Sequence, residues 1–390
     1  MISQKRIALS ILLLLILTGC WDRKELNDQA IILAWGFDIN EDGTYRGTAQ
    51  FAIPSKLGSD STSSQSGAFF TVSGYGKNMF ETTKDMQLKV SRSWFAGQRR
   101  VVLIGEKLAK QGLSKVLDEL SRDPIVRLRT DIFVLKDATV HDFLQLSYPL
   151  EVVSSNALVK MHQAAGLDPD LTLRDFLMAD VSIESCPVLP VIKKGSSSEK
   201  ESGEPDMKLW GFAIFNKESR LVKYLPMKES YIRQWIIGQL ESNIFTVNIP
   251  GEKENIVIET YHLKSKIHTS QQGDKVRIYV TLSGVGKIHE NNTQLDLANS
   301  KNMMLVQSEL NTQISSFAQE VTRKVQTLGT DIFGFGEAFH RQHPYAWKGI
   351  KENWGDSFAK AEVSFTLNVQ VREEGLSSLS SNVRENKGKK

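Results

Sequence analysis

The chain has 390 residues, of which 41% are hydrophobic and 24% charged, and its formal net charge is +3. This composition is ordinary for a globular protein and leaves room for two or three domains. A nearly neutral chain gives no electrostatic reason to expect nucleic acid as a partner.

The first 20 residues have the pattern of an export signal. Lys5 and Arg6 precede an apolar run from residue 7 to 17, which is shorter than the ~20 residues that a membrane-spanning helix needs. A basic start, a short apolar core and small residues at its end are typical of a secretory signal peptide. The run ends in the residues of a bacterial lipobox, Leu17, Thr18, Gly19 and Cys20.

The lipobox pattern implies a diacylglycerol on the Cys20 sulfur and cleavage after Gly19. Residues 1–19 would then be removed, and the mature chain would be held at a bilayer by its acyl chains. The alternative is an ordinary signal peptide that happens to contain a cysteine. With Cys20 lipidated, Cys186 is the other cysteine, so no intramolecular disulfide is expected and Cys186 is expected to be a buried thiol.

A polar tether at 20–29 leads into an N-terminal α/β domain expected over residues 30–137. Strands and helices take turns there, which is typical of a sheet covered by helices. The strands are expected at 30–39, 45–53, 68–73, 100–104 and 125–135, and the helices at 78–90 and 106–121.

Residues 138–193 are expected to form a helical middle domain. Its candidate helices lie at 139–146, 154–165 and 172–179, with Thr172 as the N-cap of the last. A Ser-, Gly- and charge-rich segment at 194–206 predicts a linker.

The C-terminal α+β domain is expected at 207–375, with a disordered tail at 376–390. A hairpin, a helix near 230–240 and long alternating strands predict a mostly antiparallel sheet. Apolar residues spaced three and four apart predict one long amphipathic helix from Met303 to Leu328, with Phe317 in the middle of its buried stripe. The fold class is therefore mixed α/β or α+β and multi-domain, each domain being a sheet with packed helices.

Three separated motifs resemble one known family. They are Cys20-Trp21-Asp22 with Glu25-Leu26 after the lipobox, Val101 to Leu113 followed by Ser121-Arg122-Asp123, and Asp331 to Gly336 followed by Trp347, Trp354 and Phe358. The chain resembles the Ger(x)C family, the C subunits of bacterial spore germinant receptors. The resemblance implies three small domains and a lipoprotein on the outer surface of the inner spore membrane. It also implies two membrane-embedded partners, subunits A and B, and no catalytic residues.

The residues themselves show no catalytic, cofactor or metal site. His340 and His343 form the one close histidine pair, but no glutamate follows them at metalloprotease spacing and Pro344 interrupts a helix. The glycine pairs at 74–76 and 334–336 lack the lysine or third glycine of a nucleotide-binding loop, so close packing or a turn is the favoured interpretation.

Aromatic residues gather between 333 and 358. The favoured interpretation is a local core that joins the long helix to the last strand. The alternative is that some rings face outward and anchor a partner, with Phe335, Trp347 and Trp354 as the candidate interface.

The leading hypothesis is a non-enzymatic, lipid-anchored subunit of a spore germinant receptor, active through assembly or signalling. The alternative is a solute-binding lipoprotein of a transporter, which would hold a ligand between two lobes. A lipid-tethered cell-wall hydrolase is disfavoured because no acid–base or metal constellation is present.

Overall fold

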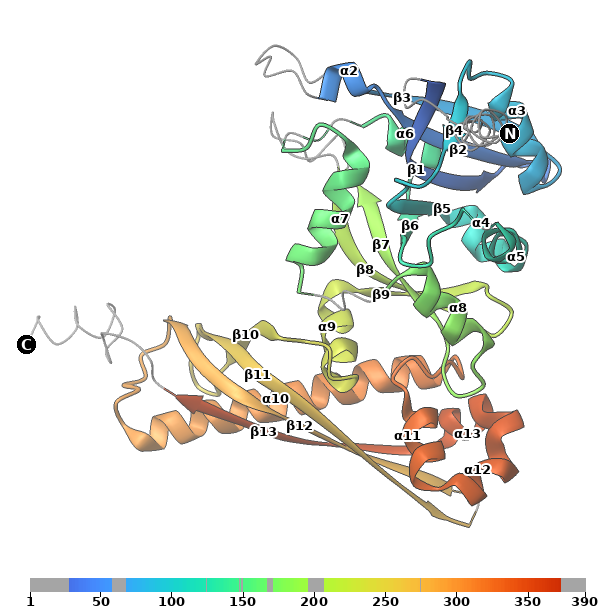
Figure 1. Ribbon diagram of the computed structural model, residues 1–390. Coiled ribbons are helices and arrows are strands. Elements are labelled where there is room, and N and C mark those ends of the chain that lie inside the picture. Colours follow the sequence, from blue (N-terminus) through green and yellow to red (C-terminus); the bar gives the residue numbers. More distant parts are fainter. Residues whose placement is uncertain are drawn as a thin grey trace, which may run out of the picture.

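The computed structural model describes residues 28–57, 68–123, 125–146, 148, 150–166, 171–195, 207–273 and 275–372. These residues form two β-sheets with packed helices (Figure 1), so the mixed α and β fold class expected from the sequence is confirmed. The signal peptide, the lipobox, residues 196–206 of the expected linker and the tail 376–390 lie outside the described residues. None of the helices that the structure describes combines the length and the apolar character needed to cross a membrane.

The larger sheet has four parallel strands at its centre and antiparallel strands on both sides. Its strands are β1 (Gln29–Ile39), β2 (Tyr45–Ala52), β3 (Phe69–Gly76), β4 (Ser93–Phe95), β5 (Val101–Gly105), β6 (Asp131–Lys136), β7 (Val188–Lys194), β8 (Met207–Phe215) and β9 (Leu221–Pro226). Their order in space is β3-β2-β1-β5-β6-β7-β8-β9, with β4 beside β1. Strands β1, β5, β6 and β7 run parallel, and residues 101–104 of β5 are completely buried because helices cover both faces.

Helices lie on both faces of this sheet. They are α3 (Met79–Gln87), α4 (Glu106–Gln111), α5 (Ser114–Arg122), α6 (Val140–Leu144), α7 (Ser154–Ala164) and α8 (Leu173–Val181), with the short α2 (Pro54–Leu57) after β2. Apolar residues of α3, α4, α5 and α8 share one core with the sheet, and those of α6 and α7 share another. Thr172 caps α8 through a capping box with Asp175, which confirms the predicted N-cap.

The structure differs from the sequence-based expectation at two places in this region. The helix expected over 106–121 is divided into α4 and α5, because Gly112 has a φ of +125°. The strand expected at 125–135 begins only at Asp131, and the residues before it form turns.

The smaller sheet contains the longest elements of the molecule. Its strands, in spatial order, are β10 (Ser242–Asn248), β11 (Asn255–Gln272), β12 (Lys275–Asn291) and β13 (Glu362–Arg372). The first three are antiparallel, as predicted, whereas β13 runs parallel to β12 because helix α10 (Ser300–Gln326) carries the chain back along the sheet (Figure 1). Three short helices follow α10: α11 (Phe335–Gln342), α12 (Pro344–Ile350) and α13 (Trp354–Lys360).

Helix α10 confirms the predicted amphipathic stripe, with one correction. Its fully or almost fully buried apolar residues are Val306, Leu310, Ile314, Ala318, Val321 and Val325. Phe317, expected at the centre of the stripe, is only partly buried. The contact line follows Ile314 and Ala318, four residues apart, and this places Phe317 at its border.

The two sheets do not coincide with the domain boundaries expected from the sequence. Strand β7 pairs with β6 and with β8, so the larger sheet continues from before residue 137 to beyond the expected linker at 194–206. The helices at 138–193 cover that sheet and have no separate core of their own. The structure therefore contains two sheets where the resemblance implied three domains, each with a sheet.

Helix α9 (Met227–Ile236) joins the two sheets. Its Ile232 and Trp235 are completely buried in a core that also contains Phe212 of β8 and Ile258 of β11. The Trp235 indole N–H donates to the carbonyl of Lys264 at 3.2 Å. The sheets thus share apolar residues across α9.

Candidate functional site

The candidate interface residues of the sequence analysis are buried. Phe335, Trp347 and Trp354 are 0%, 4% and 3% exposed, so their proposed role as outward anchors is corrected. Helices α11, α12 and α13 fold their rings over one another, and the Trp347 and Trp354 ring centroids lie 5.4 Å apart. These three residues belong to a local core, which is the favoured interpretation of the sequence. Tyr345 on α12 is 86% exposed and is the ring of this region that faces outward.

Asp331 holds this aromatic cluster together. Its Oδ1 accepts from the Phe333 amide at 2.9 Å, and its Oδ2 accepts from the Gly336 amide at 2.7 Å and from the Trp354 indole at 3.1 Å. Burial raises the pKa of the Asp331 carboxyl, although these donors oppose the shift. The Asp331 carbonyl also accepts from the Cys186 amide at 2.7 Å, which connects the cluster to the start of β7.

The glycines of the same motif are required by the backbone and by close packing. Gly334 has a φ of +72°, which favours glycine. A Cβ on Gly336 would lie 2.3 Å from the Glu184 carbonyl oxygen and 2.6 Å from the Trp354 indole nitrogen. His340 on α11 pairs with the Glu184 carboxylate. The motif at 331–336 is therefore a structural joint between the segment before β7 and the C-terminal helices.

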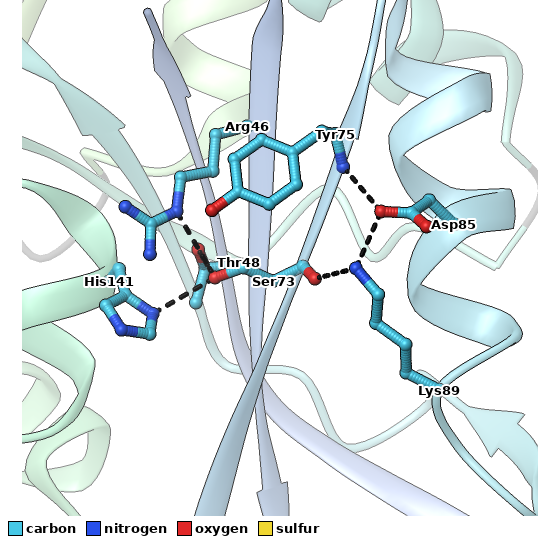
Figure 2. Close-up of polar contacts among 7 residues, drawn as sticks. All are labelled: Arg46, Thr48, Ser73, Tyr75, Asp85, Lys89 and His141. Carbon is cyan, nitrogen blue, oxygen red and sulfur yellow. Dashed lines mark hydrogen bonds and ion pairs between the residues drawn. The ribbon is translucent and has the colours of Figure 1, made fainter.

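A second polar cluster lies where α6 covers β2 and β3 (Figure 2). The Ser73 hydroxyl is 2.8 Å from the Thr48 hydroxyl, 3.0 Å from His141 Nδ1 and 3.4 Å from Arg46 Nε, which donates to it. Ser73 and His141 are 68 residues apart in the chain, so no local sequence pattern pairs them.

The Ser73–His141 pair lacks two features of a serine nucleophile. The other ring nitrogen of His141 lies 3.0 Å from the Gln145 amide nitrogen, where a triad would place a carboxylate. Burial and the positive charge of Arg46 lower the pKa of His141, which makes it a weaker base. The cluster thus orders the sheet surface and is poorly suited to activate the serine hydroxyl.

Helix α3 completes the free edge of β3 (Figure 2). Asp85 Oδ2 accepts from the Tyr75 amide at 2.9 Å, and Lys89 Nζ donates to the Ser73 carbonyl at 2.9 Å. The two side chains also form an ion pair of 2.7 Å. The Tyr75 amide and the Ser73 carbonyl at the edge of β3 would otherwise face water, and they are therefore hydrogen-bonded by the Asp85 and Lys89 side chains.

Two hollows could be considered as ligand sites. One of about 370 Å³ lies at the carboxyl ends of β1, β5 and β6, beside Asp38. Burial raises the pKa of Asp38 to about 6, and its Oδ2 accepts from the Val140 amide at 2.9 Å. The other, of about 690 Å³, lies between the end of α7, the turn after α9 and β11, and only Leu240 and Leu263 among its lining residues are apolar. No group of three or more potential metal ligands occurs in the part of the chain that the structure describes.

Two family models match the chain and together span most of it. The model described as the spore germination protein N-terminal domain matches residues 22–194. The model described as spore germination B3/GerAC like, C-terminal, matches residues 210–375.

Relatives of similar length support the same assignment. Spore germination protein KC of Bacillus subtilis (strain 168) is 26% identical over 386 residues, covering 94% of this chain and 95% of the relative. Spore germination protein GerQC of Bacillus cereus is 22% identical, covering 96% and 99%. The crystal structure of the GerBC protein has a TM-score of 0.57 and 17% identity, and the alignment covers 86% of this chain and 96% of that one. At this identity the likeness shows the fold.

Proposed function

The chain belongs to the GerAC family of spore germination proteins, and from that membership we propose that it is a non-enzymatic, lipid-anchored subunit of a spore germinant receptor. The observation that carries the proposal is the position of the family match. It begins at residue 22, directly after the lipobox that ends at Cys20, and continues to residue 375. Relatives named as spore germination proteins match it over nearly their whole length.

A lipid on Cys20 would anchor a chain that has no other proposed anchor. Each buried methylene contributes about 0.8 kcal/mol, and two acyl chains hold a protein stably where one holds it weakly. The nine-residue tether from Trp21 to Gln29 spans at most about 30 Å. The body would therefore stay close to the headgroups on the extracytoplasmic face, which in a spore is the outer surface of the inner membrane.

Confinement of the folded chain to the membrane surface explains how it could act without an active site. The proposed partners are the membrane-embedded A and B subunits, whose loops would emerge at the same surface. Tethering raises the effective concentration of the body for these loops, so individually weak contacts suffice. The unsuitable geometry of Ser73 and His141 supports a role in assembly or signalling instead of turnover.

Replacing the lipidated cysteine tests the proposal. Cys20→Ala should release the full-length chain from membranes and abolish its co-purification with multi-span partners. Cys186→Ala is the matched control, because it removes the buried thiol and leaves the lipobox intact. Membrane retention of the Cys20→Ala chain, with its signal peptide still processed, would contradict the proposed anchorage.

The second candidate function is a solute-binding lipoprotein, and the 690 Å³ hollow between α7, α9 and β11 is the observation that favours it. Half of its lining residues are polar (Gln163, Gln239, Glu241 and His262), whereas typical small-molecule sites are lined predominantly by apolar side chains. Calorimetry of the mature chain with amino acids, sugars and nucleosides decides between the two functions. Binding at micromolar concentration would favour the solute-binding function, and no heat of binding is expected for the receptor subunit.

A further inference from the structure

The outward face of α3 and the residues beside it combine exposed apolar and basic side chains. Phe80 and Leu88 are 65% and 87% exposed, which is unusual for large apolar residues eight positions apart on one side of a helix. Lys84 lies on the same side, with its ammonium 5.3 Å from the centre of the Phe80 ring, and Lys77 and Arg92 are exposed just before and after the helix. These five residues are called the α3 face below.

The acidic residues of α3 are occupied by the fold. Glu81 Oε2 accepts from the Lys77 amide at 2.7 Å, and Asp85 is engaged with the Tyr75 amide and with Lys89. Within the described residues, no ion pair involves Lys84 or Arg92. The inward side of the helix packs on the sheet through Met79 and Met86. The exposed Glu81 carboxylate keeps its negative charge, so the three cations give the α3 face a net positive charge beside apolar groups.

One end of the α3 face, at Arg92, lies beside the point where the chain enters the fold. Residues 88–92 connect α3 to β4, and the side-chain Nε2 of Gln87 donates to the Arg92 carbonyl at 3.2 Å. The next residue, Ser93, donates to the Asp28 carbonyl at 3.2 Å and pairs with Gln29 of β1. Figure 1 shows α3 and β4 together at one end of the molecule. Cys20 precedes Asp28 by only eight residues.

We propose that the α3 face rests on an anionic bilayer surface, with Phe80 and Leu88 at the headgroup boundary and Lys77, Lys84 and Arg92 against lipid phosphates. This inference rests on the proposed lipid anchorage at Cys20, which brings the face within tether reach of the membrane. Exposed Phe and Leu beside Lys and Arg are the composition with which amphipathic helices bind membrane surfaces. Attraction between basic residues and anionic lipids acts only within about one Debye length, roughly 8–10 Å, so the short tether is what makes it effective.

The orientation can be measured on the full-length lipidated chain in vesicles made of equal parts of phosphatidylglycerol and phosphatidylcholine. Leu88→Cys, carrying an environment-sensitive fluorophore, should shift to the blue and be quenched several-fold by lipids with a spin label near the headgroup. Cys186 is buried and would not compete for the label. Tyr345→Cys is the matched control, because Tyr345 is equally exposed but lies on α12 in the C-terminal part of the chain. Equal signals from both positions would overturn the proposal.

Charge reversal tests whether the α3 face binds anionic lipid. Lys84→Glu together with Lys77→Glu should reduce the quenching at position 88 several-fold and make it insensitive to phosphatidylglycerol. Lys348→Glu is the control, since Lys348 lies over the Tyr345 ring at 5.7 Å and reproduces the Lys84–Phe80 contact elsewhere. Quenching that is unchanged by the reversal, or that is equal in pure phosphatidylcholine, would show that anionic lipid is not what the face binds.

Flotation of the same samples separates this inference from the anchorage on which it rests. A chain that floats with vesicles but shows no quenching at position 88 refutes the orientation and leaves the lipid anchor standing. A chain with intact Cys20 that does not float refutes both. The thermal midpoint of each variant verifies that the fold is unchanged.

Discussion

The outer strands of the two sheets are completed by helices in different ways. In the larger sheet, the edge of β3 is bound by the ion pair of Asp85 and Lys89, whose side chains are 35% and 43% exposed. In the smaller sheet, neutral side chains of α10 form hydrogen bonds with the backbone of the edge strands β10 and β13. Asn311 both donates to and accepts from the Val369 backbone of β13, at 3.1 and 3.0 Å. Gln313 likewise bonds both backbone groups of Asn248 on β10, at 2.6 and 3.2 Å.

This difference shows that the free backbone groups of an edge strand can be hydrogen-bonded by charged or by neutral side chains. Which kind is present decides how the stability of each sheet depends on pH and salt. Hydrogen bonds from Lys89 and from the Tyr75 amide lower the pKa of Asp85, so its contribution is present at neutral pH and is lost as acid protonates it. Salt also screens an exposed ion pair. Amide side chains are affected by neither, so the smaller sheet should depend mainly on packing.

The largest expected effect tests that dependence on packing. Leu310 of α10 is completely buried, and Leu310→Ala should lower the free energy of unfolding by about 4 kcal/mol. Phe317→Ala should lower it by less, because that ring is only partly buried. Chemical denaturation of the full-length chain measures both. A larger loss for Phe317→Ala would mean that the contact line of α10 lies elsewhere.

The next largest effect is expected at Asp331, whose carboxyl group is buried. Asp331→Ala leaves the Phe333 and Gly336 amides and the Trp354 indole without their acceptor, at a cost of about 3 kcal/mol. Asp331→Asn should also destabilise, because its NH2 group would face N–H donors. Asp356→Asn, at an exposed position of α13, serves as the control. Unchanged unfolding of Asp331→Ala would contradict the role of Asp331 as a joint.

The edge strands allow a direct test of the comparison. Asn311→Ala should cost about 1.5 kcal/mol at any salt concentration, since it removes two neutral hydrogen bonds. Asp85→Ala should cost about 0.5 kcal/mol at low salt and less at high salt. Denaturation at two ionic strengths measures the difference, and equal salt sensitivity of the two variants would remove the distinction between the sheets.

The last expected effect concerns pH. Burial raises the pKa of Asp38 to about 6, so the folded chain keeps this proton to a higher pH than the unfolded chain does. The free energy of unfolding should therefore fall as pH rises from about 4 to 6, and Asp38→Asn should remove on the order of 1 kcal/mol of that fall. Burial also raises the pKa of Asp131 to about 6 and of Glu119 to about 7, which adds to the same trend. A variant with an unchanged pH profile would show that Asp38 does not titrate in this range.

Sequence periodicity predicted those parts of the fold that one buried face determines. Long alternating strands predicted the antiparallel sheet that contains β12, and apolar spacings of three and four predicted α10. Features that depend on distant neighbours were not predictable. Gly112 breaks the helix expected at 106–121, and β13 pairs parallel to a strand more than 70 residues earlier in the chain.

The candidate site was predicted less well, for a related reason. Aromatic enrichment indicates either a core or an interface, and only the folding of three short helices decided that Trp347 and Trp354 are buried. The α3 face did carry a local signal. Phe80 and Leu88 fall on the side of α3 opposite to Met79 and Met86. Helix periodicity is usually used to identify one buried apolar stripe, so apolar residues on the opposite side are easily overlooked.

The position of Cys186 has a consequence for chemical durability. Burial raises the pKa of its thiol to about 11, so at neutral pH roughly one molecule in ten thousand carries the reactive thiolate. Peroxide and disulfide exchange both act through the thiolate, and both are slowed in proportion. If Cys20 is capped by lipid, the mature chain has no readily oxidised cysteine. Its useful lifetime would then be limited by slower reactions at other side chains.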